Sequence, residues 1–256
     1  MRYLEAGRGR PLVLLHSFPL HADQWIPQLE HVPPGWRAIA PDLFGCGATT
    51  AEAGVPQTMA RQADEVIELL DHLGVDRAAI AGVSMGGYVA LALLQRAASR
   101  LTGVMLADTR ATADTDEGRA GRDRMIAMVE REGVVGVARE MLPKLLGPTT
   151  HRERPDVVAT VEHLIASNSV VGVRAALLAI KARPDSTPLL ATVSCPTWIL
   201  CGEEDGLTPP ADSALMHRAI AGSRYDVLPR TGHLSNLEAP TAFNAALQEF
   251  LAWISN

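Results

Sequence analysis

Short apolar runs alternate with longer amphipathic stretches over the first 107 residues of the chain. Residues 78–81 are apolar and uncharged, as expected of a strand covered on both faces of a sheet. Residues 87–98 return apolar side chains at helical spacing, and residues 59–73 carry them on one stripe with charges opposite. Residues 101–107 then read as another strand. This alternation predicts an α/β fold with a parallel sheet covered by helices.

The pattern changes after residue 109. No strand pattern appears between residues 110 and 184, and glycine or proline separates four helical stretches, at 117–132, 134–146, 155–166 and 170–182. The sheet pattern resumes near residue 197. We therefore expect an all-helical segment, residues 110–184, inserted into one α/β core made of residues 1–109 and 185–256.

The pentapeptide Gly82-Val83-Ser84-Met85-Gly86 lies between the predicted strand 78–81 and the predicted helix 87–98. A turn that tight needs glycines because they lack a Cβ. It would raise the Ser84 hydroxyl above the sheet edge at a helix N-terminus, where it could act as a nucleophile. The alternative is a serine that merely caps the helix.

A nucleophilic serine needs a base and an acid, and both follow later strands. Residues 197–201 form an apolar run that ends in an acidic, glycine-rich turn containing Asp205. Residues 225–228 predict a further strand, with His233 in the loop after it. The chain order serine, aspartate, histidine is that of the α/β-hydrolase triad. Each residue would lie beyond the C-terminal end of a strand, where open α/β sheets build their sites.

The chain resembles the α/β-hydrolase superfamily nearly from end to end. Residues 11–19 resemble the strand and loop of the oxyanion hole, residues 41–47 the D-x-x-G-x-G turn, and residues 202–209 and 232–240 the acid and histidine loops. The resemblance implies a mostly parallel sheet flanked by helices, with an inserted helical cap. Two departures stand out: His16-Ser17 replaces the usual His-Gly, as in enol-lactonase-like members, and the family's first strand is missing or vestigial. We therefore expect seven strands.

The resemblance also implies roles for residues. Asp205 is favoured as the acid because Pro209 follows it as in the family's loop, although Glu203, Glu204 and Asp108 are rivals. If Asp108 is not the acid, its loop is expected at the hinge of the helical segment, away from the histidine. His16 would order the oxyanion loop. The oxyanion hole would consist of the backbone N–H groups of Phe18 and Met85. The side chains expected to bind substrate are Phe18, Met85, Met125, Met128 and Met141, which would favour a small or medium apolar acyl group.

Bulk properties narrow the choice of partner and cofactor. A net charge of −6 argues against nucleic acid or an anionic membrane as the main partner. The three cysteines form no C-x-x-C pair, and no signal-like or membrane-length apolar segment is present, which indicates a cytoplasmic protein with reduced thiols. The histidines lack metal-ligand spacing, so we expect no metal and no cofactor.

The expected activity is that of a serine hydrolase which cleaves carboxylic esters or lactones through an acyl-enzyme. Within the superfamily the chain is similar to small carboxylesterases and 3-oxoadipate enol-lactonase-like enzymes, and its partner would be a small-molecule substrate. Carbon–carbon bond hydrolases and hydroxynitrile lyases use the same triad, and a ligand receptor with slow turnover could retain it. The sequence motifs leave these alternatives open.

Overall fold

A computed structural model describes residues 1–49 and 57–255 and contains one twisted sheet of seven strands. The strands are β1 (Tyr3–Gly7), β2 (Arg10–Leu15), β3 (Trp36–Pro41), β4 (Ala78–Val83), β5 (Leu101–Ala107), β6 (Thr197–Gly202) and β7 (Arg224–Leu228). Their spatial order is β1-β3-β2-β4-β5-β6-β7. β1 pairs antiparallel to β3 and every other pair is parallel. The predicted seven-stranded, mostly parallel sheet is confirmed.

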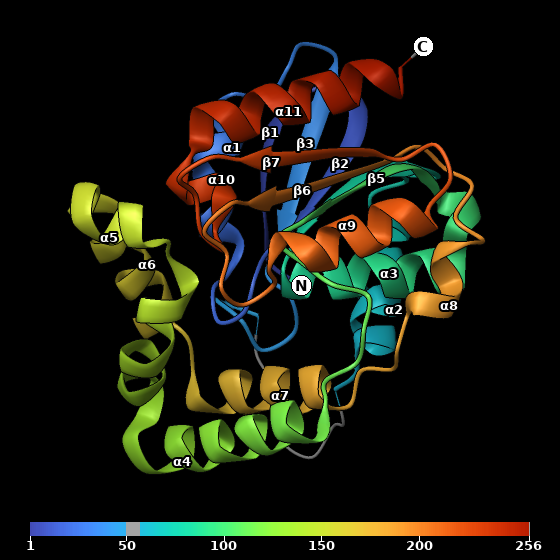
Figure 1. Ribbon diagram of the computed structural model, residues 1–256. Coiled ribbons are helices and arrows are strands. Elements are labelled where there is room, and N and C mark those ends of the chain that lie inside the picture. Colours follow the sequence, from blue (N-terminus) through green and yellow to red (C-terminus); the bar gives the residue numbers. More distant parts are fainter. Residues whose placement is uncertain (50–56, 256) are drawn as a thin grey trace.

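Helices cover both faces of the sheet (Figure 1). On one face lie α1 (Ile26–Leu29) and α11 (Pro240–Trp253), and on the other α2 (Met59–His72), α3 (Met85–Ala97) and α9 (Pro210–Ala219). The helices α8 (Thr187–Leu190) and α10 (Ser235–Glu238) are a single turn each. Because both faces are covered, all six residues of β4 are buried, which explains its uninterrupted run of apolar residues and glycine.

Between β5 and the single-turn helix α8 the chain forms four helices: α4 (Asp116–Leu145), α5 (Pro148–Glu153), α6 (Pro155–Ala166) and α7 (Val170–Lys181). α4 packs against α6 and α7, and the group extends from the sheet as a separate layer (Figure 1). Gly133 interrupts α4 with φ 69° and ψ −168°, a conformation open almost only to glycine. The boundary expected between helices 117–132 and 134–146 is therefore present, whereas the short helix α5 was not expected.

Polar contacts fasten these helices to the core at two places. Near α5, the Glu238 carboxylate accepts hydrogen bonds from Gly147 N and Thr150 Oγ1, at 2.8 and 2.6 Å. Near the start of α7, Asn168 accepts a hydrogen bond from Gly47 N and donates one to the Pro19 carbonyl. The helical layer is thus attached to the core before α5 and again before α7. The division into a core of residues 1–109 and 185–256 and a helical segment of 110–184 stays a prediction, and residues 50–56 and 256 of that core lie outside the described residues.

No single helix in the part of the chain that the structure describes is both long and apolar enough to cross a membrane. α6 and α7 reach such a composition only as a pair, and the pair is bent by 97°. Cys46, Cys195 and Cys201 are free thiols.

Candidate active site

Ser84 occupies a sharp turn between β4 and α3, with a left-handed backbone at φ 54°. The flanking glycines make that turn possible. A Cβ on Gly82 would lie 2.4 Å from the Gly86 carbonyl oxygen, and one on Gly86 would lie 2.0 Å from the Leu15 carbonyl oxygen. The Ser84 side chain makes no capping hydrogen bond to the described first turn of α3, so the helix-cap alternative finds no support. Its hydroxyl is instead directed at a histidine.

Ser84, His233 and Asp205 form one chain of hydrogen bonds. His233 Nε2 lies 2.8 Å from Ser84 Oγ, and His233 Nδ1 lies 2.8 Å from Asp205 Oδ2. The three side chains come from the turns after β4, β6 and β7, and all are buried. Asp205 is held in turn by the backbone N–H groups of Leu207 and Thr208, which donate to Oδ1, and by the Thr208 hydroxyl, which donates to Oδ2 at 2.6 Å. Because these donors surround the carboxylate, its orientation toward the imidazole is fixed.

The electrostatics of this chain favour an ionised aspartate beside the histidine. Burial alone would raise the pKa of Asp205, but the charge and hydrogen bond of His233 and the Thr208 donors outweigh it, and the pKa is lowered. Burial alone would lower the pKa of His233, and the Asp205 carboxylate reverses that effect, so the pKa is raised above 6.5. The pair therefore stabilises a positive charge on the imidazole when a proton arrives.

The rival acids have other partners. Glu204 accepts hydrogen bonds from the backbone N–H and the hydroxyl of Thr149, at 2.9 and 2.6 Å, and Glu203 accepts one from Arg230 N. The structure therefore brings Asp205, and neither of its neighbours, to the histidine.

Asp108 does not lie where it was expected. Its carboxylate is fully buried behind the histidine loop, where Oδ1 accepts a hydrogen bond from Gly202 N and Oδ2 accepts from the backbone N–H and hydroxyl of Ser235. Burial, and then the nearby Asp205 charge, raise the pKa of Asp108 to about 8. The expectation of a position at the hinge, away from the histidine, is wrong. It failed because β5 is the neighbour of β6 in the sheet, so its end reaches both loops.

His16 orders the loop that follows β2. Its Nε2 lies 3.0 Å from Leu43 N and must accept, so Nδ1 carries the proton and donates to the Ser17 carbonyl at 2.9 Å. Burial lowers the pKa of His16 to about 4, which keeps the ring neutral. Ser17 donates through its N–H and its hydroxyl to Gln24, whose amide in turn donates to Asn236. This network joins the loop after β2 to the histidine loop.

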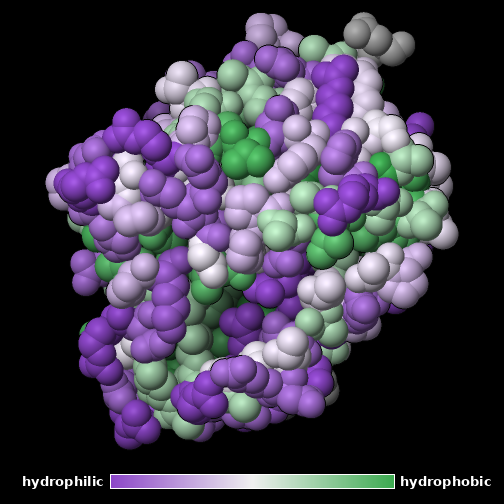
Figure 2. All heavy atoms as spheres, in the orientation of Figure 1, coloured by the Kyte–Doolittle hydropathy of each residue, from purple (hydrophilic) through white to green (hydrophobic). Residues whose placement is uncertain are grey.

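A cavity of about 720 Å³ opens at the serine and histidine. Figure 2 shows the molecule hollowed between the helical layer and the core, with hydrophilic and hydrophobic residues around the hollow. Four of the five side chains expected to bind substrate line this cavity: Phe18, Met125, Met128 and Met141. Met85 does not. Its side chain has no exposed surface and packs in the core, because the first turn of α3 directs it away from the cavity.

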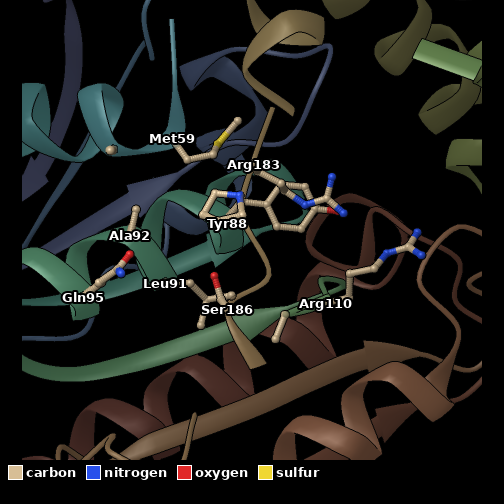
Figure 3. A pocket seen from close by; sticks show the side chains of 11 residues that line it. Met59, Tyr88, Leu91, Ala92, Gln95, Arg110, Arg183 and Ser186 are labelled. Atoms are coloured by element: carbon tan, nitrogen blue, oxygen red, sulfur yellow. The ribbon is translucent and has the colours of Figure 1, made fainter. Parts of the chain in front are cut away.

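The cavity wall is more polar than the sequence indicated. Arg122 and Arg124 of α4 line it together with Arg110 and Lys144. A smaller adjoining pocket lies between Tyr88, Leu91 and Ala92 of α3 and the stretch 183–186 (Figure 3). Arg183 lies over the Tyr88 ring there, 4.2 Å from its centre.

Sequence reasoning missed two residues of the site. Thr208 donates two hydrogen bonds to the Asp205 carboxylate. The sequence could have indicated this contact, because an aspartate followed three residues later by threonine has the spacing of a side-chain capping turn. Asn236 links the histidine loop to Gln24 over more than 200 residues of sequence, and no local signal could have shown it. In residues 1–49 and 57–255, no group of three or more histidine, cysteine, aspartate or glutamate side chains is arranged to hold a metal ion.

The model of the alpha/beta hydrolase fold family matches residues 10–240. The chain belongs to this family. One relative, 3-oxoadipate enol-lactonase 2 of Acinetobacter baylyi, is 29% identical over 250 residues, covering 97% of this chain and 91% of the relative.

Solved structures of the family superpose closely. A thermophilic esterase from Thermogutta terrifontis, with malate bound, has a TM-score of 0.96 and 39% sequence identity, covering 100% of this chain and 94% of the esterase. The enol-lactonase from Burkholderia xenovorans has a TM-score of 0.91 and 28% identity, covering 98% of this chain and 96% of the lactonase. The family members similar to this chain therefore include enzymes that hydrolyse esters and lactones.

Proposed function

We propose that this protein is a serine hydrolase that cleaves carboxylic esters or lactones through a covalent acyl-enzyme. The observation that carries the proposal is the hydrogen-bonded series from Ser84 through His233 to Asp205, with both contacts at 2.8 Å, at the edge of a cavity large enough for a substrate. The similarity to an esterase and to enol-lactonases supports the choice of substrate class.

The proposed reaction begins with proton transfer from serine to histidine. His233 Nδ1–H donates to Asp205, which leaves Nε2 free to accept the Ser84 hydroxyl proton as Oγ attacks the substrate carbonyl. The imidazolium is stabilised by the Asp205 carboxylate and then donates its proton to the leaving alkoxide. A water molecule repeats the sequence on the acyl-enzyme and releases the acid.

The negative oxygen of the tetrahedral intermediate needs two donors. We infer that these are the backbone N–H groups of Phe18 and Met85, since neither donates to an acceptor within the described residues. Gly86 permits the close approach of α3 to Leu15, which brings the start of that helix next to the loop containing Phe18. Removing one such donor lowers kcat by about 10²–10³ in related chemistry.

The helical segment 110–184 serves as the lid in this proposal. Met125, Met128 and Met141 of α4 supply apolar surface for the acyl group, and a volume of about 720 Å³ suits small to medium acyl chains. The contacts at Glu238 and Asn168 hold the lid in place over the serine.

Replacing the nucleophile tests the mechanism. Ser84→Ala should abolish hydrolysis of p-nitrophenyl butyrate and leave the far-ultraviolet circular dichroism spectrum unchanged, since only one oxygen is lost. A fluorophosphonate should label the wild type at Ser84 with one equivalent. Ser99→Ala, at an exposed serine just beyond the C-terminal end of α3, is the matched control and should retain full activity and labelling. Hydrolysis by Ser84→Ala near the wild-type rate would overturn the covalent mechanism.

A panel of esters, lactones and β-diketones separates this proposal from carbon–carbon bond hydrolysis and from a receptor with slow turnover. Turnover of esters or lactones with none of the diketone supports it. Selective cleavage of the diketone would make the protein a carbon–carbon bond hydrolase. Ligand-induced stabilisation without turnover of any member would make it a receptor.

A further inference from the structure

The cavity at Ser84 is basic although the protein is acidic. The chain has a net charge of −6, yet four cationic side chains and only two carboxylates line the cavity. The cations are Arg110, Arg122, Arg124 and Lys144, and the carboxylates are Asp114 and Glu140. An excess of positive charge in a concave, low-dielectric space attracts an anionic ligand.

Ion pairs within the wall occupy some of these cations. Arg122 lies 3.1 Å from Asp114, which also contacts the buried Arg183 at 2.8 Å. Lys144 pairs with Glu140 one turn away on α4. Because these arginine and lysine side chains are paired with carboxylates of the cavity wall, they are poorly placed to bind a substrate.

Arg110 differs from Arg122 and Lys144, as does Arg124, which is exposed on α4. The carboxylate oxygen closest to Arg110, Oδ2 of Asp212, is 3.7 Å away, beyond a good hydrogen bond. One terminal nitrogen donates to the Leu207 carbonyl, and Nε is buried with no acceptor among the described residues. The guanidinium is therefore positioned mainly by a neutral group, and its terminal N–H groups, unlike the buried Nε, retain capacity to bind another partner.

The position of Arg110 suits a substrate attached to the catalytic serine. It follows β5 by three residues, and its partner Leu207 lies two residues after Asp205. It lines the same cavity as Ser84 and His233, with its side chain about one third exposed. In Figure 3 the side chain extends away from Leu91 and Ala92, the apolar side chains of the adjoining pocket. A group bound by Arg110 would thus belong to the same molecule as the bond that is cut.

We propose that the substrate carries a second, ionised carboxylate, and that Arg110 binds it. The inference rests on the proposed function, because it names which esters or lactones the site prefers. A planar guanidinium matches a carboxylate with two parallel hydrogen bonds. The lost hydration of the carboxylate is replaced by these bonds, whereas an uncharged substrate would leave the remaining terminal N–H groups of Arg110 without an acceptor in the substrate.

Paired substrates test the proposal. Mono-p-nitrophenyl glutarate carries the carboxylate on the acyl side and is compared with p-nitrophenyl valerate. On the alcohol side, 4-carboxyphenyl butyrate is compared with p-nitrophenyl butyrate. Arg110→Gln should lower kcat/KM about 10- to 100-fold for at least one carboxylate substrate and change it less than twofold for the neutral ones. Comparing wild type and variant on each substrate cancels differences in leaving-group reactivity.

Controls separate recognition from structure. Arg110→Lys keeps the charge without the planar fork and should recover part of the lost rate. Arg139→Gln, also on α4 but outside the cavity lining and paired with Glu132, should leave kcat/KM unchanged for the carboxylate and the neutral substrates. All rates are measured on the pH plateau, because Arg110 slightly lowers the pKa of His233.

Equal losses on neutral and charged substrates in Arg110→Gln would overturn the proposal, since they indicate a structural residue. So would selective loss of the carboxylate substrates in Arg124→Gln with Arg110→Gln unaffected. A wild type that hydrolyses neutral esters but shows no selective loss in Arg110→Gln refutes this inference and leaves the proposed function standing. A wild type inactive on all four substrates refutes the proposed function itself.

Discussion

Adjacent carboxylates in this protein serve different parts of the molecule. Asp205 binds the His233 imidazole, and Glu204 binds the first turn of α5. If Asp205 sets the histidine tautomer and stabilises the imidazolium, Asp205→Asn should lower kcat by about 10⁴. Glu204→Gln should keep kcat within a few-fold, because its partner is Thr149. Steady-state kcat values of both variants on one ester measure this difference, and equal losses would contradict the assignment of the acid.

Asp108 gives a prediction about pH. Its pKa is raised from 3.8 to about 8, mainly by burial, so the folded state binds a proton that the unfolded state has released between those values. The free energy of unfolding should therefore fall as pH rises through this window, by up to about 1.4 kcal/mol per pH unit. Asp108→Asn cannot titrate and should lose this contribution. His233 and Asp205 titrate in both proteins, but the Asp108 charge also raises the pKa of His233, so the difference between the two pH dependences reports the Asp108 proton together with this coupling.

Urea unfolding of wild type and Asp108→Asn at about pH 5 and about pH 7 measures that difference. Parallel slopes would mean that the Asp108 carboxyl ionises freely. The variant should also lose activity, by as much as about 10², because an amide cannot accept from Gly202 and Ser235 together and the histidine loop would shift. The nearly neutral effect expected from a hinge position does not follow from these contacts.

At the scale of elements, local patterns predicted most of the fold. β5 occupies the predicted range, and α6 begins at Pro155 and ends at Ala166 as expected, because proline at the first helical position and periodic apolar residues mark it clearly. The break in α4 at Gly133 could also be predicted from the local sequence. A glycine between two amphipathic stretches can adopt a backbone conformation that other residues avoid.

Elements that are stabilised by contacts with distant parts of the chain could not be predicted from the local sequence pattern. α5 has six residues and no strong periodicity, and its first turn is held by Glu204 and Glu238 from loops more than 50 residues away. The same contrast between local and distant contacts applies to the site. Ser84, Asp205 and His233 lie in local motifs, whereas the partners of Asp108 and the charges of the cavity wall depend on which loops the sheet order brings together. The spacing of residues in the sequence does not indicate that strand order.

At the scale of the whole molecule, the site depends on two layers staying together. The serine and histidine belong to the core, and much of the cavity wall belongs to the helical segment. The segment is attached through Glu238 beside α5 and through Asn168 before α7. Gly172 at the start of α7 also packs so closely on Gly45 that a Cβ would lie 1.6 Å from its carbonyl oxygen. These contacts predict that the two layers unfold in one transition.

The distribution of tryptophan makes that prediction measurable. Trp25, Trp36, Trp198 and Trp253 all lie outside residues 110–184, so their fluorescence reports on the core. Circular dichroism at 222 nm also reports on α4 to α7, which hold a large share of the helix. The two signals should change with the same urea midpoint, because the helical segment cannot separate from the core at Glu238 and Asn168 without exposing buried polar groups. Asn168→Ala removes one attachment and should move the dichroism midpoint below the fluorescence midpoint. Separate midpoints in the wild type would show instead that the helical layer opens while the core remains folded.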